Sequence, residues 1–169
     1  MTITDLHFLD QEDELLKELG RVTRRWAFID LQLVATLDVA LRNMVVAQNI
    51  IFEKTNSGRQ RFETFKDCIG VSMFDENERK AIIDCINAFI PLLRVRNELI
   101  HEPMDIGVTT RGGSVALGVQ AMSRKGIRRD VDIDAIRRHV SEVDVLIDRY
   151  DGIYMALAGK YRVDSIFGV

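Results

Sequence analysis

The sequence predicts a mainly α-helical protein: a bundle of four or five helices, with a small β-hairpin inserted before the last long helix. Apolar residues recur at steps of three and four over most of the 169 residues, which is the spacing of one buried helix face. The two prolines and eleven glycines are too few for long linkers. Apolar residues alternate instead over about 106–131, which indicates short strands. We therefore expect a single domain over residues 1–169 with a β-insertion at about 106–131.

The first part of the chain is expected to hold a short helix followed by a long one. Residues 4–19 form an acidic helix candidate, and Gly20 is a possible stop signal. A long helix follows at about 22–53, because no proline or glycine interrupts its apolar stripe. Asp30 lies inside this stripe, where a carboxylate is unusual.

Two further helices are expected before the β-insertion. The third helix begins after Ser57, a residue type that caps helix N-termini, and ends at Gly70. The fourth begins at Asp75, which forms a capping box with the glutamate three residues later. Pro91 should kink this helix or divide it. Pro103 prevents the helix from continuing, so residues just before it occupy the last turns.

The last third of the chain combines strands with the final helix. A glycine turn at 111–113 joins two strands, and a second turn at 125–126 adds a third short strand. The final helix begins at Asp132 or Asp134 and carries the most regular apolar stripe of the chain. That stripe comprises Ile133, Ile136, Val140, Val143, Ile147, Tyr150, Tyr154 and Leu157. His139 projects away from it and is expected to be exposed to solvent.

Composition and charge exclude several classes of protein. A net charge of −3 argues against binding nucleic acid through bulk charge, so any RNA contact would be a local patch. Cys68 and Cys85 lack metal-ligand spacing and are expected to be reduced core residues. We therefore expect no metal and no cofactor. The N-terminus does not follow the plan of a signal peptide, and no apolar run reaches membrane-spanning length. These features predict a cytoplasmic protein without a membrane segment.

The most informative feature is the hexapeptide Arg-Asn-Glu-Leu-Ile-His at residues 96–101. Six positions of the fourth helix project within about 40° of a common direction, and Arg96 is the polar member of this stripe. The other members are Ile82, Ile86, Phe89, Leu93 and Ile100. Because an isolated buried charge is costly, Arg96 must be paired, line a cavity or face a partner. Asp30 is its expected partner, either as a purely structural ion pair or as a brace for an active site.

These residues resemble the signature of the HEPN superfamily. That signature is an arginine followed by four to six residues and a histidine, with a polar residue, often asparagine, directly after the arginine. Arg96, Asn97 and His101 match it with four intervening residues. The segment 25–30 also looks like the early helix of the family, where an acidic residue often lies near the signature. The resemblance covers most of residues 22–159 in architecture and about ten residues in motif.

The resemblance implies a metal-independent endoribonuclease that acts as a homodimer, with a role as a toxin or a phage-defence effector and an antitoxin as a partner. Other members of the superfamily have lost catalysis and bind RNA, a nucleotide or a protein partner, and this non-catalytic module is the alternative function. A third reading is a purely structural all-α dimer. Some members are modified on a tyrosine two positions after the histidine. This chain has Pro103 there, which argues against that arrangement.

The residue types of the motif suit metal-free cleavage of RNA, in which the 2′-hydroxyl attacks the adjacent phosphorus. His101 can shuttle the proton near neutral pH, and Arg96 can brace the phosphate and offset developing charge. Asn97 lies one turn before His101 and can orient its ring or donate to the phosphate. Arg96 and His101 are about 140° apart on an ideal helix. One chain is therefore expected to assemble the site poorly, whereas a symmetric homodimer that joins these faces would complete it.

A second group of basic residues suggests an extended RNA path. It lies around the second turn and at the start of the final helix, and comprises Arg124, Lys125, Arg128, Arg129, Arg137 and Arg138. The alternative is an ordinary solvated hairpin tip. Interleaved aromatic residues that would stack on bases are absent from this group, so sequence-specific recognition of RNA is not expected.

Overall fold

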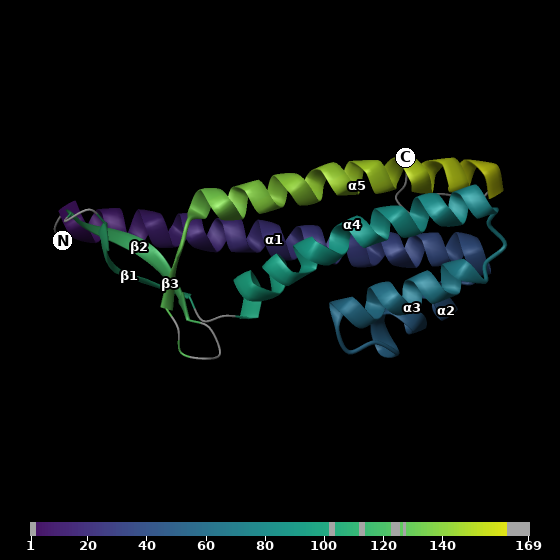
Figure 1. Ribbon diagram of the computed structural model, residues 1–169, viewed down its shortest axis with the longest axis horizontal. Coiled ribbons are helices and arrows are strands. Elements are labelled where there is room, and N and C mark those ends of the chain that lie inside the picture. The colour runs from purple at the N-terminus through teal and green to yellow at the C-terminus, as the bar shows by residue number, and fades with distance from the viewer. Residues whose placement is uncertain (1–2, 102–103, 112–113, 123–125, 127, 162–169) are drawn as a thin grey trace. The chain divides into compact units, whose positions relative to one another are not determined.

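The chain is mainly helical, with a small antiparallel sheet whose strands come directly before the last helix in the sequence (Figure 1). The computed structural model describes residues 3–101, 104–111, 114–122, 126 and 128–161. Its elements are α1 (Ile3–Leu41), α2 (Met44–Gln48), the π-helical turn η1 (Asn49–Glu53), α3 (Gly58–Gly70), α4 (Glu76–His101), β1 (Met104–Arg111), β2 (Ser114–Met122), β3 (Arg128–Val131) and α5 (Ile133–Tyr161). The predicted fold class, a mainly α protein with a β-insertion before the last helix, is confirmed.

Contacts within the chain define two compact units. The first unit comprises Met1–Arg25 and Arg94–Glu142, and the second comprises Trp26–Leu93 and Val143–Val169. Each boundary falls inside a long helix, so α1, α4 and α5 each contribute residues to both units. The expectation of a single domain stays a prediction.

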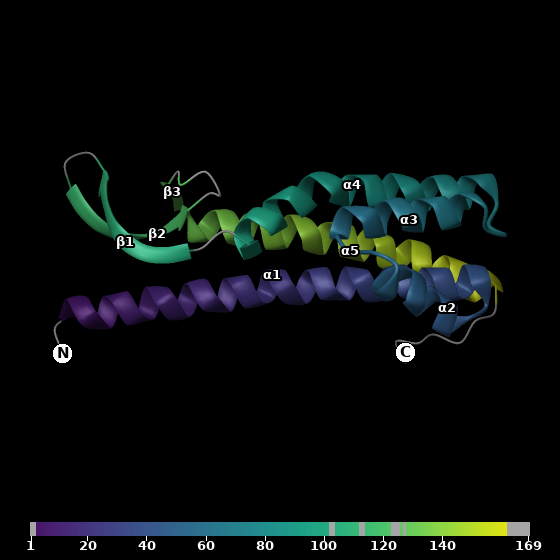
Figure 2. The same cartoon turned by 90° about the horizontal axis from the view of Figure 1, so that it is seen from below.

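The second unit is helical and is built around an aromatic cluster. Trp26 of α1, Phe62 of α3 and Phe89 of α4 are all buried. Their ring centroids lie 6.2 to 6.3 Å apart in each pair, within the range in which aromatic rings attract one another. Figures 1 and 2 show α3 lying alongside the first part of α4. The cluster therefore fixes the position of α4 within this unit.

The end of α5 is held in the same unit by buried hydrogen bonds. Tyr150 Oη donates to Thr36 Oγ1 on α1 at 2.9 Å, and both residues are buried. Burial raises the pKa of Tyr150, so the hydroxyl remains a neutral donor. Gln32 Nε2 donates to Asp151 Oδ1 one residue further along. Because buried polar groups are costly without partners, these bonds specify how α1 and α5 align.

The predicted helix caps are confirmed. Ser57 Oγ accepts a hydrogen bond from Gln60 N at 3.2 Å at the start of α3. Asp75 and Glu78 form a reciprocal capping box at the start of α4, with distances of 2.9 and 3.0 Å. Pro91 lies inside α4, which continues through it as one helix. Helix α4 ends at His101, as expected from the following proline.

The first helix is longer than predicted at its start. The expected stop after residues 4–19 is wrong, because α1 continues through Gly20. A glycine costs a helix about 1 kcal/mol relative to alanine. Leu15 and Val22, on either side of this glycine, are both buried. Their burial outweighs the local cost, since each buried aliphatic side chain contributes about 1.5–3 kcal/mol.

The predicted long helix over 22–53 is wrong at its C-terminal side, where α1 ends at Leu41. Arg42 has a φ of +53°, a left-handed conformation that terminates helices. Asn43 then caps α2, and its Oδ1 accepts from Val46 N at 3.1 Å. The chain is still helical through Glu53, but in two short pieces.

The first unit contains a three-stranded antiparallel sheet in the order β1-β2-β3. Ile106 of β1 pairs with Val119 of β2, which in turn pairs with Val131 of β3. The predicted third strand is therefore confirmed. Figure 2 shows β1 and β2 as one curved ribbon pair. The glycines expected at the first turn, 112–113, lie outside the described residues.

His139 of α5 is buried in the first unit, with 4% of its surface exposed. The expectation of an exposed side chain is wrong, because His139 lies three and four residues from the buried Ile136 and Val143 and so shares their side of the helix. Burial lowers the pKa of His139, and Glu142 opposes this effect. The histidine is thus favoured in its neutral form. Of the cysteines, Cys85 is buried as expected and Cys68 is half-buried.

The buried histidine predicts a pH-dependent stability. Below about pH 6.5, the ordinary pKa of histidine, the unfolded chain takes up a proton that the buried ring of His139 resists. The free energy of unfolding should therefore fall as the pH drops. Urea denaturation at about pH 7.5 and about pH 5.5 measures this loss. His139→Gln should lose less stability than the wild type over the same interval, and equal losses in both proteins would contradict the assignment.

Candidate functional site

The motif residues lie on the last two turns of α4, inside the first unit. Arg96 is half-buried, whereas Asn97 and His101 are exposed. Leu99 is buried and anchors this part of the helix. The four apolar residues of the stripe that precede Arg96, from Ile82 to Leu93, are also buried. The buried apolar face of the helix therefore extends as far as the motif, and polar side chains follow at the end of the helix.

The three motif side chains contact one another within one chain. Arg96 Nη1 donates to Asn97 Oδ1 at 2.9 Å, and it lies 3.2 Å from His101 Nε2. Arg96 and His101 therefore meet within one chain, and the expectation that a second copy is needed to complete the site stays a prediction. Positions 96 and 101 still differ by a large angle around the helix axis. However, five residues rise only about 7.5 Å along a helix, and the long arginine side chain spans that distance.

The contact between Arg96 and His101 determines which ring nitrogen can carry the proton. A guanidinium has only N–H donors and no acceptor. His101 Nε2 must therefore accept the hydrogen bond, which places the proton of the neutral ring on Nδ1. Asn97 holds the guanidinium through its side-chain oxygen, and its expected roles, to orient the ring of His101 or to donate to the phosphate, stay predictions.

A second arginine lies one half-turn before the motif arginine and has a different environment. Arg94 Nε pairs with Glu98 Oε1 at 3.1 Å, one turn further along α4. The Arg94 side chain is 85% exposed. Exposed pairs of this kind contribute little to stability. Arg94 is therefore a suitable control for substitutions of Arg96.

Asp30 belongs to the second unit, on α1. It forms an ion pair with Arg61 of α3, and both side chains are half-buried. This pairing lies inside the helical unit and ties α3 to α1. The expected contact of Asp30 with Arg96 joins residues of different units and stays a prediction.

The basic group around the second turn is only partly within the described residues. Arg124 and Lys125 lie outside them. Arg128 and Arg129 belong to β3, where they pair in register with Met122 and Ala121 of β2. Contact of these four basic residues with RNA stays a prediction.

Arg137, one of the basic residues considered for an RNA path, is the centre of a cluster of carboxylates. It contacts Glu14 on α1, Glu18 Oε1 at 3.4 Å and Asp134 Oδ1 at 2.8 Å. Hydrogen bonds to Asp134 and Glu14 raise its pKa. Glu18 is buried and also contacts Arg21 at 3.2 Å. The cluster joins α1 to α5 in the first unit, and its carboxylates disfavour an incoming phosphate.

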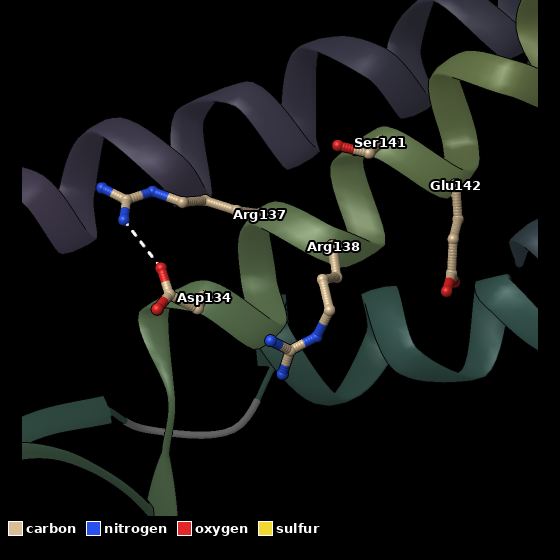
Figure 3. Close-up of a pocket in the computed structure, with 5 residues that line it drawn as sticks. All are labelled: Asp134, Arg137, Arg138, Ser141 and Glu142. Carbon is tan, nitrogen blue, oxygen red and sulfur yellow. Dashed lines mark hydrogen bonds and ion pairs between the residues drawn. The ribbon is translucent and has the colours of Figure 1, made fainter.

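Figure 3 shows the surface depression beside this cluster. Arg137 and Ser141 project from one side of α5, and Arg138 and Glu142 from the other. Arg138 pairs with Asp132 at 3.3 Å. The lining therefore mixes both signs of charge, and it does not resemble a phosphate site.

Sequence reasoning missed Glu18, although a signal was present. Glu18 lies three residues after Leu15 and four before Val22, so it falls in the same helical register as these buried residues. The expected break at Gly20 hid this pattern. A carboxylate inside an apolar stripe requires a cation nearby, and Arg137 and Arg21 supply it.

The described residues show neither a metal centre nor a membrane span. No group of three or more His, Cys, Asp or Glu side chains within the described part of the chain is placed to hold a metal ion. No helix among the same residues is both long and apolar enough to cross a membrane.

Comparison of the chain with models of protein families, with curated proteins and with solved structures found no match.

Proposed function

We propose that this chain is a metal-independent endoribonuclease of the HEPN type, with its site at the end of α4. The observation that carries the proposal is the contact of Arg96 Nη1 with both Asn97 Oδ1 and His101 Nε2. A cation, an amide and a titratable ring meet at an exposed helix end, where a chain of RNA can reach them. The resemblance of these three residues to the family signature supports the same activity.

The proposed reaction uses the RNA's own 2′-hydroxyl as the nucleophile. His101 Nε2 accepts the proton of this hydroxyl, and the oxygen forms a bond to the adjacent phosphorus. The bond from phosphorus to the 5′-oxygen breaks, and a general acid gives that oxygen a proton. Arg96 binds the non-bridging phosphate oxygens and offsets the charge that develops on them. The products carry 2′,3′-cyclic phosphate and 5′-hydroxyl ends.

The general acid is supplied by a second copy of the chain in a homodimer. Each copy has one motif histidine, and a single ring cannot be base and acid in the same step. A two-fold axis at the motif face brings two such rings to one phosphate. In the cell, we propose a cytoplasmic toxin or phage-defence effector that an antitoxin protein holds in check.

Cleavage of labelled RNA in excess EDTA tests the activity. The wild type should yield cyclic-phosphate ends, and Arg96→Ala and His101→Ala should each reduce the rate by about 10²–10⁴-fold, the usual contribution of proton transfer or of a charge clamp. Arg94→Ala should retain the wild-type rate, because this exposed arginine lies outside the motif. Equal cleavage by all four proteins, or cleavage that requires a divalent metal, would contradict the proposal.

Sedimentation at micromolar concentration tests the dimer. The wild type should sediment as a species of twice the chain mass, because the second copy completes the site. A monomer that still cleaves RNA in EDTA would show that one chain is sufficient, and it would overturn the composite site.

A specific observation favours a second candidate, a non-catalytic module that binds RNA. The lone pair of His101 Nε2, which a base needs, already accepts a hydrogen bond from Arg96. A site in which this contact persists can bind phosphate but cannot remove a proton. RNA binding that depends on Arg96, without any cyclic-phosphate product, would identify this module.

A further inference from the structure

The nitrogen of His101 that would act as a base is engaged by the motif's own arginine. Arg96 Nη1 carries two hydrogens. One is directed to Asn97 Oδ1 at 2.9 Å and the other to His101 Nε2 at 3.2 Å. Nε2 cannot accept the proton of the 2′-hydroxyl without opening this contact. In the free protein, the base is therefore blocked.

We propose that Arg96 acts as a latch on His101, and that a phosphodiester opens the latch by drawing the guanidinium away from Nε2. The inference rests on the proposed function, since the anion is the phosphate group of the RNA substrate. It goes further by assigning opposite roles to one arginine. Arg96 blocks the base before the substrate arrives and binds the phosphate afterwards.

The relative strength of the two contacts determines the direction of the switch. A hydrogen bond from the guanidinium to a phosphate joins two opposite charges, whereas the bond to the neutral ring of His101 has only one charged partner. Arg96 can bind a phosphate through two parallel N–H groups, whereas it reaches His101 through a single nitrogen. A phosphate at this helix end therefore competes successfully with the ring for the guanidinium.

The surroundings of the latch allow it to open. His101 and Asn97 are exposed, and His101 is the last residue of α4. The ring therefore lies at the C-terminal end of the helix. Asn97 is a positioning residue, because its oxygen accepts from the same Nη1 and keeps the guanidinium beside the ring. Loss of Asn97 should weaken the latch without removing either of the groups that react.

Nitrogen NMR of the imidazole rings tests the latch directly. The chain has three histidines, and a His101→Gln variant assigns the signals of His101. The probe is a 2′-O-methyl RNA oligonucleotide, which carries phosphodiesters but has no free 2′-hydroxyl to react. Inorganic phosphate serves as a second probe, which separates the effect of the anion from that of an RNA chain.

In the free wild type, we expect the proton of neutral His101 on Nδ1, with Nε2 as the acceptor. Adding the oligonucleotide should shift the Nε2 signal to the position that it has in unliganded Arg96→Ala. The Arg96→Ala variant should show little further shift, and Arg94→Ala should behave like the wild type. The buried ring of His139 should give an unchanged signal throughout.

Two results would overturn the latch. The first is a proton on Nε2 of neutral His101 in the free wild type. The second is an Nε2 signal that neither Arg96→Ala nor the oligonucleotide shifts. Failure of the latch differs from failure of the proposed function. An Nε2 signal that does not shift, in a protein that cleaves RNA, removes the latch and keeps the enzyme. A latch that opens without any cyclic-phosphate product keeps the switch and identifies a binding module.

Discussion

The buried face of α4 is the constraint on which the rest of the molecule depends. Phe89 of this helix packs against Trp26 and Phe62, so α4 is held by large aromatic side chains of the helical unit. Capping at Asp75 fixes where the helix begins, and the chain after His101 leaves it for the sheet. The motif therefore occupies the last turns of a helix whose start and packed face are set by other residues. Its side chains can be polar because packing upstream stabilises the helix.

In the proposed function, the contact between Arg96 and His101 links chemistry with regulation. A guanidinium beside an imidazole would be an unfavourable pair if both were charged, and it is a good hydrogen bond when the ring is neutral. The same contact occupies the lone pair of Nε2 that a base needs. A phosphate resolves this conflict because it binds the arginine more strongly than the ring does. Substrate binding and activation of the base are then one event.

Much of this architecture follows from local rules. Ser57 and the Asp75 box mark helix starts through their own hydrogen bonds, and alternating apolar residues mark the strands. The errors arise where a tertiary effect outweighs a local one. Gly20 does not end α1, because burial on both sides stabilises the helix, and Arg42 ends it in a left-handed conformation that its residue type does not favour. For the site, residue types and spacing identify the motif. Arg96 contacts His101 within one chain because its side chain is long enough to reach the ring. That reach depends on the side-chain rotamer, which a helical projection of the sequence does not include.

The central claim is that Arg96 and His101 act as one catalytic unit, and a double-mutant cycle on RNA cleavage tests it most directly. The rates of the wild type, Arg96→Ala, His101→Ala and the double variant are compared under the same metal-free conditions. Residues that act together lose activity non-additively. The account predicts that the double variant is about as slow as the slower single variant. Losses that multiply, so that the double variant is slower by the product of the two single effects, would contradict it.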